Sequence, residues 1–232
     1  MILFSVDFEL SHPDLSLGFA VQLGFCAFDT ETQQEVDHGS WMLMQPYNKL
    51  WDQETYERFW SVEGKGKSLL ERYQDPKTRK VHAALAIQSF LEKLDALRQT
   101  GKKLMFIGDA LSVDMPWLKM LLELYVDVQS AQPRCPYHLA DPKKYQHILQ
   151  VPDFLRGRAS IGLDDRRTDY WKANERLFGL EPFELAPELC EGIGRHDALY
   201  DARALVHRFG RLYPHLIGKA RRSWASDDEQ SE

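Results

Sequence analysis

The sequence has few cysteines, and none of the three lies close to another. Cys26, Cys135 and Cys190 form no Cys-x-x-Cys pair. This spacing excludes a zinc ribbon of that type, and an odd, scattered set provides no disulfide framework. Such cysteine usage is typical of a reducing compartment, so we expect a cytoplasmic protein. A zinc site at Cys135 and His138 is a further hypothesis, but the Cys-x-x-His pair lacks two of the four ligands that zinc needs.

The sequence also lacks long apolar runs and an excess of positive charge. No run reaches the length of a membrane-spanning helix, and the first ten residues are too short and too acidic for a secretory signal, so we expect no membrane partner. The 29 basic and 35 acidic residues give a formal charge of −6. A nucleic-acid partner would therefore be held locally, by metal ions or by a basic patch. The pairs Arg166–Arg167 and Arg221–Arg222 could touch phosphates, although a solvated face is the favoured explanation for both.

The composition of the chain, 44% apolar and 12% aromatic, is typical of a globular protein, and the sequence contains no internal repeat. We expect one domain over residues 1–218 and a charged, disordered tail over 219–232. Apolar patterning predicts strands at 1–9, 17–29, 36–46 and 102–109. It predicts helices at 51–60, 81–97, 113–128, 168–180 and 196–213. We expect 65–78 to be a surface connection, and 129–168 shows no sustained period. This order predicts an α/β fold, a mixed sheet with helices on both faces.

Two acidic residues close the first predicted strand, in the stretch MILFSVDFEL. Alternation along a strand places Asp7 and Glu9 on one face, together with Leu3 and Ser5. Two carboxylates on one face of a strand that is apolar on both sides repel each other, and burying them without a partner is costly. A divalent cation would compensate for this repulsion. The alternative is a strand end that emerges into solvent.

A second acidic group lies in the stretch FIGDALSVDMPWL, where a predicted strand runs into a loop and then a helix. Asp109 and Asp114 both follow the strand. Strand ends in α/β folds converge on the crevice where ligands bind, so an acid here would lie beside the end of the first strand if the two strands were neighbours. The alternative for Asp114 is a helix N-cap.

The third group, GRHDALYDARAL, begins the last predicted helix. Asp201 follows Ala198 by three residues and precedes Leu205 by four, so it projects from the buried stripe of the helix. An acid at the margin of a packed face is unusual unless it has a partner. His196 lies at or just before the start of this helix, where a capping or surface histidine is the alternative.

In this order, the motifs V-D-F-E, S-V-D-M-P-W-L and H-D-A-L-Y-D-A resemble those of the DEDDh-type 3′→5′ exonucleases. That family includes oligoribonuclease, ribonuclease T and proofreading exonuclease domains. The resemblance covers residues 1 to about 213. It implies a ribonuclease H-like fold, a five-stranded mixed β-sheet flanked by helices. It also implies that two divalent cations, Mg²⁺ or Mn²⁺, are bound by Asp7, Glu9, Asp114 and Asp201, with His196 as the general base.

The resemblance further implies hydrolysis of single-stranded RNA or DNA from the 3′ end, with release of nucleoside 5′-monophosphates, and it allows a homodimer. Asp114 is preferred to Asp109 because the family's acid is followed by a leucine four residues on, here Leu118. The chain departs from the family where Leu10 and Ser11 follow the first motif in place of Thr or Gly. It departs again at Ala110, where the family often has Asn. We expect these departures to affect how the substrate's terminal nucleotide is bound more than they affect the metal chemistry.

Nucleic-acid bases could stack on exposed aromatic rings near these motifs. The predicted contacts with nucleic acid are Phe8, Leu10, Ser11 and Trp60. Phe59 is a further possible platform, and for all three aromatic residues an ordinary core position is the alternative.

Two other classes of function are consistent with parts of the sequence. One is an inactive binding or interaction module on the same fold. The other is a phosphohydrolase using His196–Asp197 as an HD pair, a class that is all-helical and needs further histidines.

Overall fold

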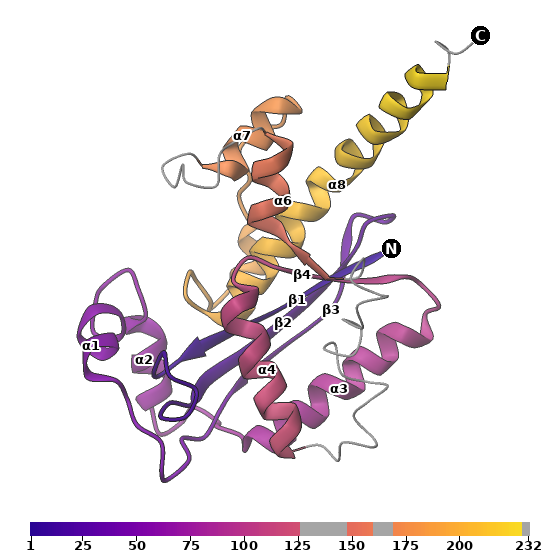
Figure 1. The fold of residues 1–232 in the computed structure, drawn as a ribbon. Helices are drawn as coiled ribbons and strands as arrows, with labels where there is room; N and C mark the ends of the chain where they lie inside the picture. Colours follow the sequence, from indigo (N-terminus) through magenta and orange to yellow (C-terminus); the bar gives the residue numbers. More distant parts are fainter. Residues whose placement is uncertain (126–147, 160–168, 229–232) are drawn as a thin grey trace.

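The computed structural model describes residues 1–125, 148–159 and 169–228. Its five strands form one sheet in the order β3-β2-β1-β4-β5 (Figure 1). The strands are β1 (Ile2–Leu10), β2 (Ala20–Asp29), β3 (Gln34–Met42), β4 (Leu104–Gly108) and β5 (Ile148–Gln150). The pairs β1–β2 and β2–β3 are antiparallel, whereas β1–β4 and β4–β5 are parallel. The predicted five-stranded mixed sheet is confirmed.

Helices cover both faces of this sheet. The longer ones are α2 (Lys67–Gln74), α3 (Ala83–Gln99), α4 (Leu111–Tyr125), α6 (Val151–Arg158), α7 (Tyr170–Leu177) and α8 (Ala198–Asp228). The short ones are α1 (Gln53–Thr55), the π-helix η1 (Tyr56–Trp60) and the 3₁₀-helix η4 (Pro187–Leu189). Figure 1 shows α3 and α4 on one side of the sheet and α8 on the other, with α6 and α7 beside α8.

The two faces of β1 pack into two separate cores. Phe4 and Phe8 belong to the core beneath α3 and α4. Leu3 belongs to the core beneath α8, which also contains Phe209. Because side chains alternate along a strand, Asp7 and Glu9 lie on the same face as Leu3. The alternation predicted from the sequence is therefore confirmed, and it directs both acids toward α8.

A third cluster of buried residues lies beside the sheet and is rich in aromatic rings. It includes Phe19, Trp60 and Tyr73. Tyr73 comes from α2, which also buries Leu69 and Leu70. The prediction that 65–78 is a surface connection is therefore wrong: the spacing of its apolar residues at i, i+1 and i+4 is that of a short amphipathic helix.

Other element boundaries also differ from prediction. Helix α4 begins at Leu111, two residues before the predicted start, so Asp114 lies in its first turn and not at its N-cap, and Pro116 lies inside the helix. Strand β5 and helix α6 fall in the stretch that showed no period. Helix α8 continues to Asp228 through most of the tail predicted to be disordered. The division of the chain into one domain and a tail stays a prediction.

Some predicted features lie outside the described residues. These are the Cys135–His138 pair and the Arg166–Arg167 pair. Among the helices that are described, none has the length and apolar character needed to cross a membrane.

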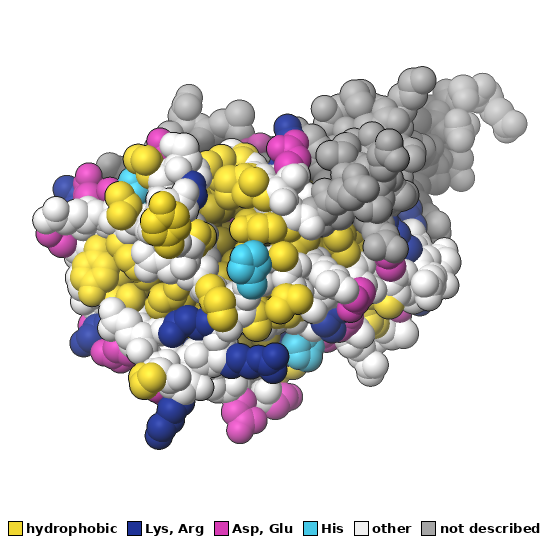
Figure 2. All heavy atoms as spheres, turned by 90° about the horizontal axis from the view of Figure 1, so that it is seen from below, with side chains coloured by type: hydrophobic (Ala, Val, Ile, Leu, Met, Phe, Trp, Pro, Cys, Tyr) yellow, Lys and Arg dark blue, Asp and Glu magenta, His cyan; other side chains and the backbone are white. Residues whose placement is uncertain are grey.

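Apolar side chains gather on the end of the molecule seen from below in Figure 2, with lysine and arginine side chains among them and at the rim of that view. The loop after β3 and the adjacent end of α3 lie at this end in Figure 1. Their exposed large hydrophobic residues are Met44, Tyr47, Leu50 and Leu85.

Candidate metal centre

The register of the sheet brings the first two acidic groups together. Strands β1 and β4 are parallel neighbours, with Phe4 opposite Phe106. Three residues further along the chain, Asp7 lies in β1 and Asp109 directly follows the end of β4. Carboxyl ends of parallel strands meet at one edge of a sheet, and α4 then returns Asp114 to the same place. One carboxylate oxygen from each of Asp7, Asp109 and Asp114 lies within 4.8 Å of the others.

Helix α8 brings the third group to the same edge from the other side. Ligand atoms of Glu9, His196 and Asp201 also lie within 4.8 Å of one another. Glu9 and Asp7 are two residues apart on one face of β1, so the two triplets are adjacent. The five residues predicted as catalytic therefore come together, and Asp109 joins them.

Two residues of β2 allow α8 to approach this closely, and the sequence analysis missed both. Gly24 lies opposite Asp7 in the sheet, and a Cβ on Gly24 would lie 2.1 Å from the carbonyl carbon of Ala198. Gln22 lies opposite Glu9, and its side-chain oxygen accepts a hydrogen bond of 3.0 Å from the backbone N–H of Ala198. The absent side chain at Gly24 lets the helix start rest on the sheet, and the amide of Gln22 fixes its position.

Burial raises the pKa of each carboxyl predicted to bind metal. Repulsion from neighbouring acids adds to this rise, and at Asp201 the hydrogen bond from the His196 backbone opposes it. The pKa of Glu9 rises to about 8, that of Asp114 to about 7 and that of Asp201 to about 6. The pKa of Asp7 is also raised well above its usual value, since Asp114, Glu9 and Asp201 all act on it. Ionisation of the whole set near neutral pH needs compensating positive charge.

His196 is held in an unusual backbone conformation beside Asp201. Its φ of 63° is rare for a residue with a side chain, and its backbone N–H donates a 3.0 Å hydrogen bond to the Asp201 carboxylate. Its ring packs edge-on against Phe59, with the centroids 5.0 Å apart. Burial, followed by the positive charges of Arg195 and Lys65, lowers the pKa of His196 below its ordinary value. A mainly neutral imidazole at pH 7 is able to accept a proton.

Arg72 of α2 forms hydrogen bonds with the loop that carries His196. The Arg72 guanidinium donates to the Asp197 carboxylate, and a second N–H donates to the carbonyl of Gly192 at 3.2 Å. Asp197 is 3% exposed, and its other oxygen accepts the Leu199 N–H at 3.0 Å, which caps the start of α8. With both carboxylate oxygens of Asp197 engaged and a sheet in the core, the HD phosphohydrolase hypothesis is excluded.

Three of the four residues predicted to contact nucleic acid are buried, and the fourth is half-buried. Trp60 is fully buried and donates its indole N–H to the carbonyl of Leu10 at 3.1 Å, and Phe8 is a core residue. Neither ring offers a face to a base, so the stacking prediction for these two residues is wrong. Ser11 is also buried, where its hydroxyl donates to Leu50 and accepts from the Phe19 N–H. Leu10 is half-buried, and its contact with nucleic acid stays a prediction.

A separate group, formed by Cys26, Glu35 and His207, has donors close enough for a cation. There, however, Arg203 already makes a bidentate ion pair with Glu35, with N–O distances of 2.9 and 3.0 Å. Hydrogen bonds from His207 and Arg203 outweigh burial and lower the pKa of Glu35 to about 2. This group is accounted for as an ion pair that joins β3 to α8.

No protein-family model and no curated protein matches the chain. Solved structures do match it. The nuclease domain of 3′hExo, a DEDDh family member bound to rAMP, gives a TM-score of 0.56 at 12% identity, with 92% of each chain covered. A 3′-exonuclease solved for specific recognition of the histone mRNA stem-loop 3′ end gives 0.56 at 12% identity, covering 91% of this chain and 63% of that one. Cell-death related nuclease 4 gives 0.53 at 12% identity, covering 92% and 64%.

The chain thus spans slightly less than two thirds of the last two structures and nearly all of the first. At this level of identity the likeness concerns the fold. The chain has the ribonuclease H-like fold of the DEDDh exonuclease structures, as its motifs implied.

Proposed function

We propose that this chain is a metal-dependent nuclease that removes nucleotides from the 3′ ends of single-stranded RNA or DNA. The observation that carries the proposal is the convergence of β1, the segment after β4, and α8 on one edge of the sheet. These elements supply Asp7, Glu9, Asp109, Asp114 and Asp201, and the loop before α8 supplies His196. The fold likeness to structures named as 3′-exonucleases supports the same reaction class.

The donor set fits divalent cations. Carboxylate oxygens are the ligands that Mg²⁺ and Mn²⁺ take, and the raised pKa values of Glu9 and Asp114 identify a site that favours added positive charge. Two cations would be held by Asp7, Glu9, Asp114 and Asp201. When bound, they would stabilise charge on the attacking and leaving oxygens of a phosphodiester.

His196 is the proposed general base, which takes a proton from the attacking water. Three features suit this role: its lowered pKa, its ring held against Phe59, and its backbone hydrogen bond to Asp201. Attack on the terminal phosphodiester would release a nucleoside 5′-monophosphate and leave a new 3′-hydroxyl. Cleavage from an end also suits the net charge of −6, since no long basic track is needed.

The second candidate is an inactive module on the same fold that binds nucleic acid or protein. The complete set of five predicted residues favours the enzyme. The cytoplasmic location and a homodimer stay predictions from the sequence.

The direct test is incubation with 3′-labelled single-stranded RNA and DNA in Mg²⁺, Mn²⁺ or excess chelator. The expected result is release of labelled mononucleotide with either cation and none with chelator. Asp7→Asn keeps the shape of the side chain and removes its charge, so we expect at least a hundredfold loss of rate. Glu54→Gln, an exposed change on α1, is the matched control.

Cleavage that survives complete chelation would contradict the metal-dependent reaction. Equal cleavage by wild-type protein and Asp7→Asn would mean that the activity comes from a contaminant. Binding of single strands by the wild-type protein without any cleavage would favour the inactive module.

A further inference from the structure

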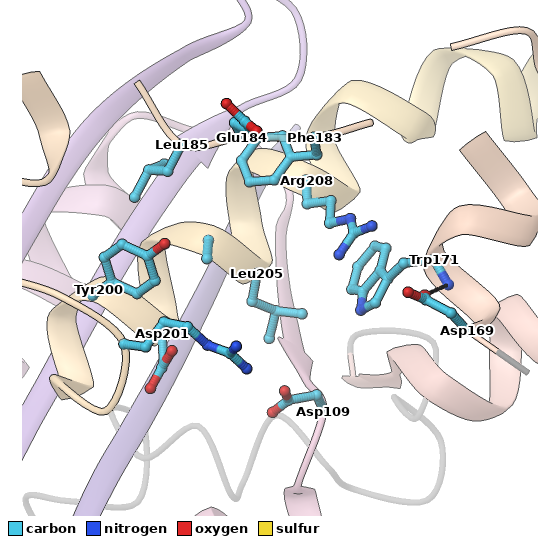
Figure 3. Close-up of a pocket in the computed structure, with 12 residues that line it drawn as sticks. Asp109, Asp169, Trp171, Phe183, Glu184, Leu185, Tyr200, Asp201, Leu205 and Arg208 are labelled. Carbon is cyan, nitrogen blue, oxygen red and sulfur yellow. Dashed lines mark hydrogen bonds between the residues drawn. The ribbon is translucent and has the colours of Figure 1, made fainter. Parts of the chain in front are cut away.

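A cavity of about 680 Å³ adjoins the metal centre on the side of α7 and α8. Its volume lies within the range of about 300–1,000 Å³ that is typical of small-molecule sites. Asp109 and Asp201 line it, so it opens directly onto both acidic triplets. Figure 3 shows Tyr200 and Asp201 on one side of this cavity and Trp171 on the other, with Asp109 at its edge.

The two arginines that line the cavity differ in what they contact. Arg208 already has a partner, since it donates two hydrogen bonds, of 2.8 and 3.0 Å, to the buried carboxylate of Glu175. Arg195 is exposed and makes no hydrogen bond or ion pair with another described residue. Arg195 lines the same cavity as Asp109 and Asp201, which places it beside the metal centre. Arg195 is therefore available to an anion at the mouth of the cavity.

Trp171 supplies a fixed aromatic surface on the opposite side. The guanidinium of Arg208 lies 4.7 Å from the ring centroid, and Asp169 accepts the Trp171 backbone N–H at 3.0 Å. Because Glu175 in turn holds Arg208, the indole is positioned by a chain of contacts from the core. An aromatic ring held in this way can stack a base at little entropic cost.

We propose that this cavity is a nucleotide subsite, in which a base packs against Trp171 while Arg195 contacts a phosphate. The inference rests on the proposed function, because it takes the phosphate to lie beside the acidic triplets. Four acids line the cavity (Asp109, Asp169, Glu184 and Asp201), against two arginines, Arg195 and Arg208, and Arg208 shares the carboxylate of Glu175 with Arg211. A phosphate therefore binds only when divalent cations offset those acids.

The test is calorimetric titration of wild-type protein with AMP and with ribose 5-phosphate, each in Mg²⁺. Arg195→Ala weakens binding of both ligands about tenfold, since both lose a charge-assisted hydrogen bond. Trp171→Ala weakens AMP binding by about five- to a hundredfold and leaves ribose 5-phosphate unchanged, since only AMP has a base to stack. Trp171→Phe keeps a ring and retains most of the AMP affinity. If Trp171→Ala does not fold, Trp171→Leu, which keeps an apolar side chain without an aromatic ring, should weaken AMP binding in the same way and leave ribose 5-phosphate unchanged.

Arg79→Ala and Trp41→Ala are matched controls, because these two residues line a different cavity, between β3 and α3. Wild-type affinity for AMP in both Arg195→Ala and Trp171→Ala would overturn the subsite. If the wild-type protein then still cleaves 3′-labelled RNA, the nuclease proposal stands and only the subsite fails. A wild-type protein that neither cleaves nor binds AMP would overturn both. AMP binding sensitive to both substitutions but without cleavage would keep the subsite in an inactive module.

Discussion

Arg72 of α2 forms an ion pair with the carboxylate of Asp197, the residue that follows His196. The pair connects the aromatic cluster beside the sheet to the start of α8. Since Asp197 also caps that helix, the position of His196 depends on a contact between segments 125 residues apart in the sequence.

Arg72→Ala should lower both stability and turnover. It leaves the Asp197 carboxylate buried without its partner, which we expect to cost about 2 kcal/mol of unfolding free energy. If Arg72 positions His196, the value of kcat falls while KM and Mn²⁺ affinity change little. Arg72→Lys restores part of kcat, because one ammonium cannot reproduce both contacts of the guanidinium. Arg58→Ala, on an exposed arginine, is the control. An unchanged kcat in Arg72→Ala would show that this ion pair serves stability alone.

The cation-free protein should lose stability as pH rises from about 4.5 to about 8. Glu9, Asp114 and Asp201 have folded-state pKa values above their ordinary values, so in this range the folded state binds more protons than the unfolded state. The unfolding free energy therefore falls with pH. Thermal unfolding in chelator at pH 5, 6, 7 and 8 measures this, and Glu9→Gln should flatten the decline. Glu35 acts oppositely but at lower pH, since its stabilising charge is lost only between about pH 4.5 and 2.

Added Mn²⁺ should reverse this dependence, because cations bind the ionised carboxylates. The midpoint of thermal unfolding rises more at pH 8 than at pH 6. An equal rise at both pH values would mean that the cation binds elsewhere.

Gly24→Ala should separate α8 from the sheet. The added Cβ would lie 2.1 Å from a backbone carbon of Ala198, where no flexible side chain can move aside. We expect a loss of about 1–3 kcal/mol of unfolding free energy and a weaker cation site at Glu9 and Asp201. Gly157→Ala in α6, where a Cβ meets nothing within 4 Å, should be neutral or slightly stabilising. Wild-type stability and Mn²⁺ affinity in Gly24→Ala would contradict the packing described.

Asp114→Asn should reduce turnover more than Asp109→Asn. Asp114 is buried among the other acids, whereas Asp109 is exposed at the edge of the same triplet. Rates measured across a Mn²⁺ titration should show a loss for Asp109→Asn that added cation restores in part, and no such rescue for Asp114→Asn. The reverse order would assign the third acidic role to Asp109.

Local pattern was sufficient for much of this fold and site. The period-two alternation of β1 places Asp7 and Glu9 on one face, and the helical spacing around Ala198 and Leu205 directs Asp201 toward the sheet. Both follow from the geometry of a single element. The choice between Asp109 and Asp114 could not be made in this way, because the two acids lie on either side of a strand-to-helix turn.

What the sequence did not reveal depends on contacts between distant segments. Nothing local distinguishes Arg72 from other surface arginines, or Gly24 from a glycine at a bend. Trp60, in contrast, is predicted to contact nucleic acid but is a core residue. From the sequence alone, an aromatic residue near a site can either stack on a base or fill a core. The burial of Trp60 involves distant segments: its indole N–H donates to the carbonyl of Leu10, and its ring belongs to the same cluster as Phe19.

The central claim is that acids from β1, α4 and α8 form one centre that needs divalent cations. Calorimetric titration of Mn²⁺ into the wild-type protein and into Asp7→Asn tests this most directly, since Asp7 belongs to one triplet and lies on the same strand face as Glu9 of the other. We predict two Mn²⁺ ions per wild-type chain and at least a tenfold loss of affinity in Asp7→Asn. Absence of Mn²⁺ binding by the wild-type protein, or equal binding by both proteins, would contradict the account.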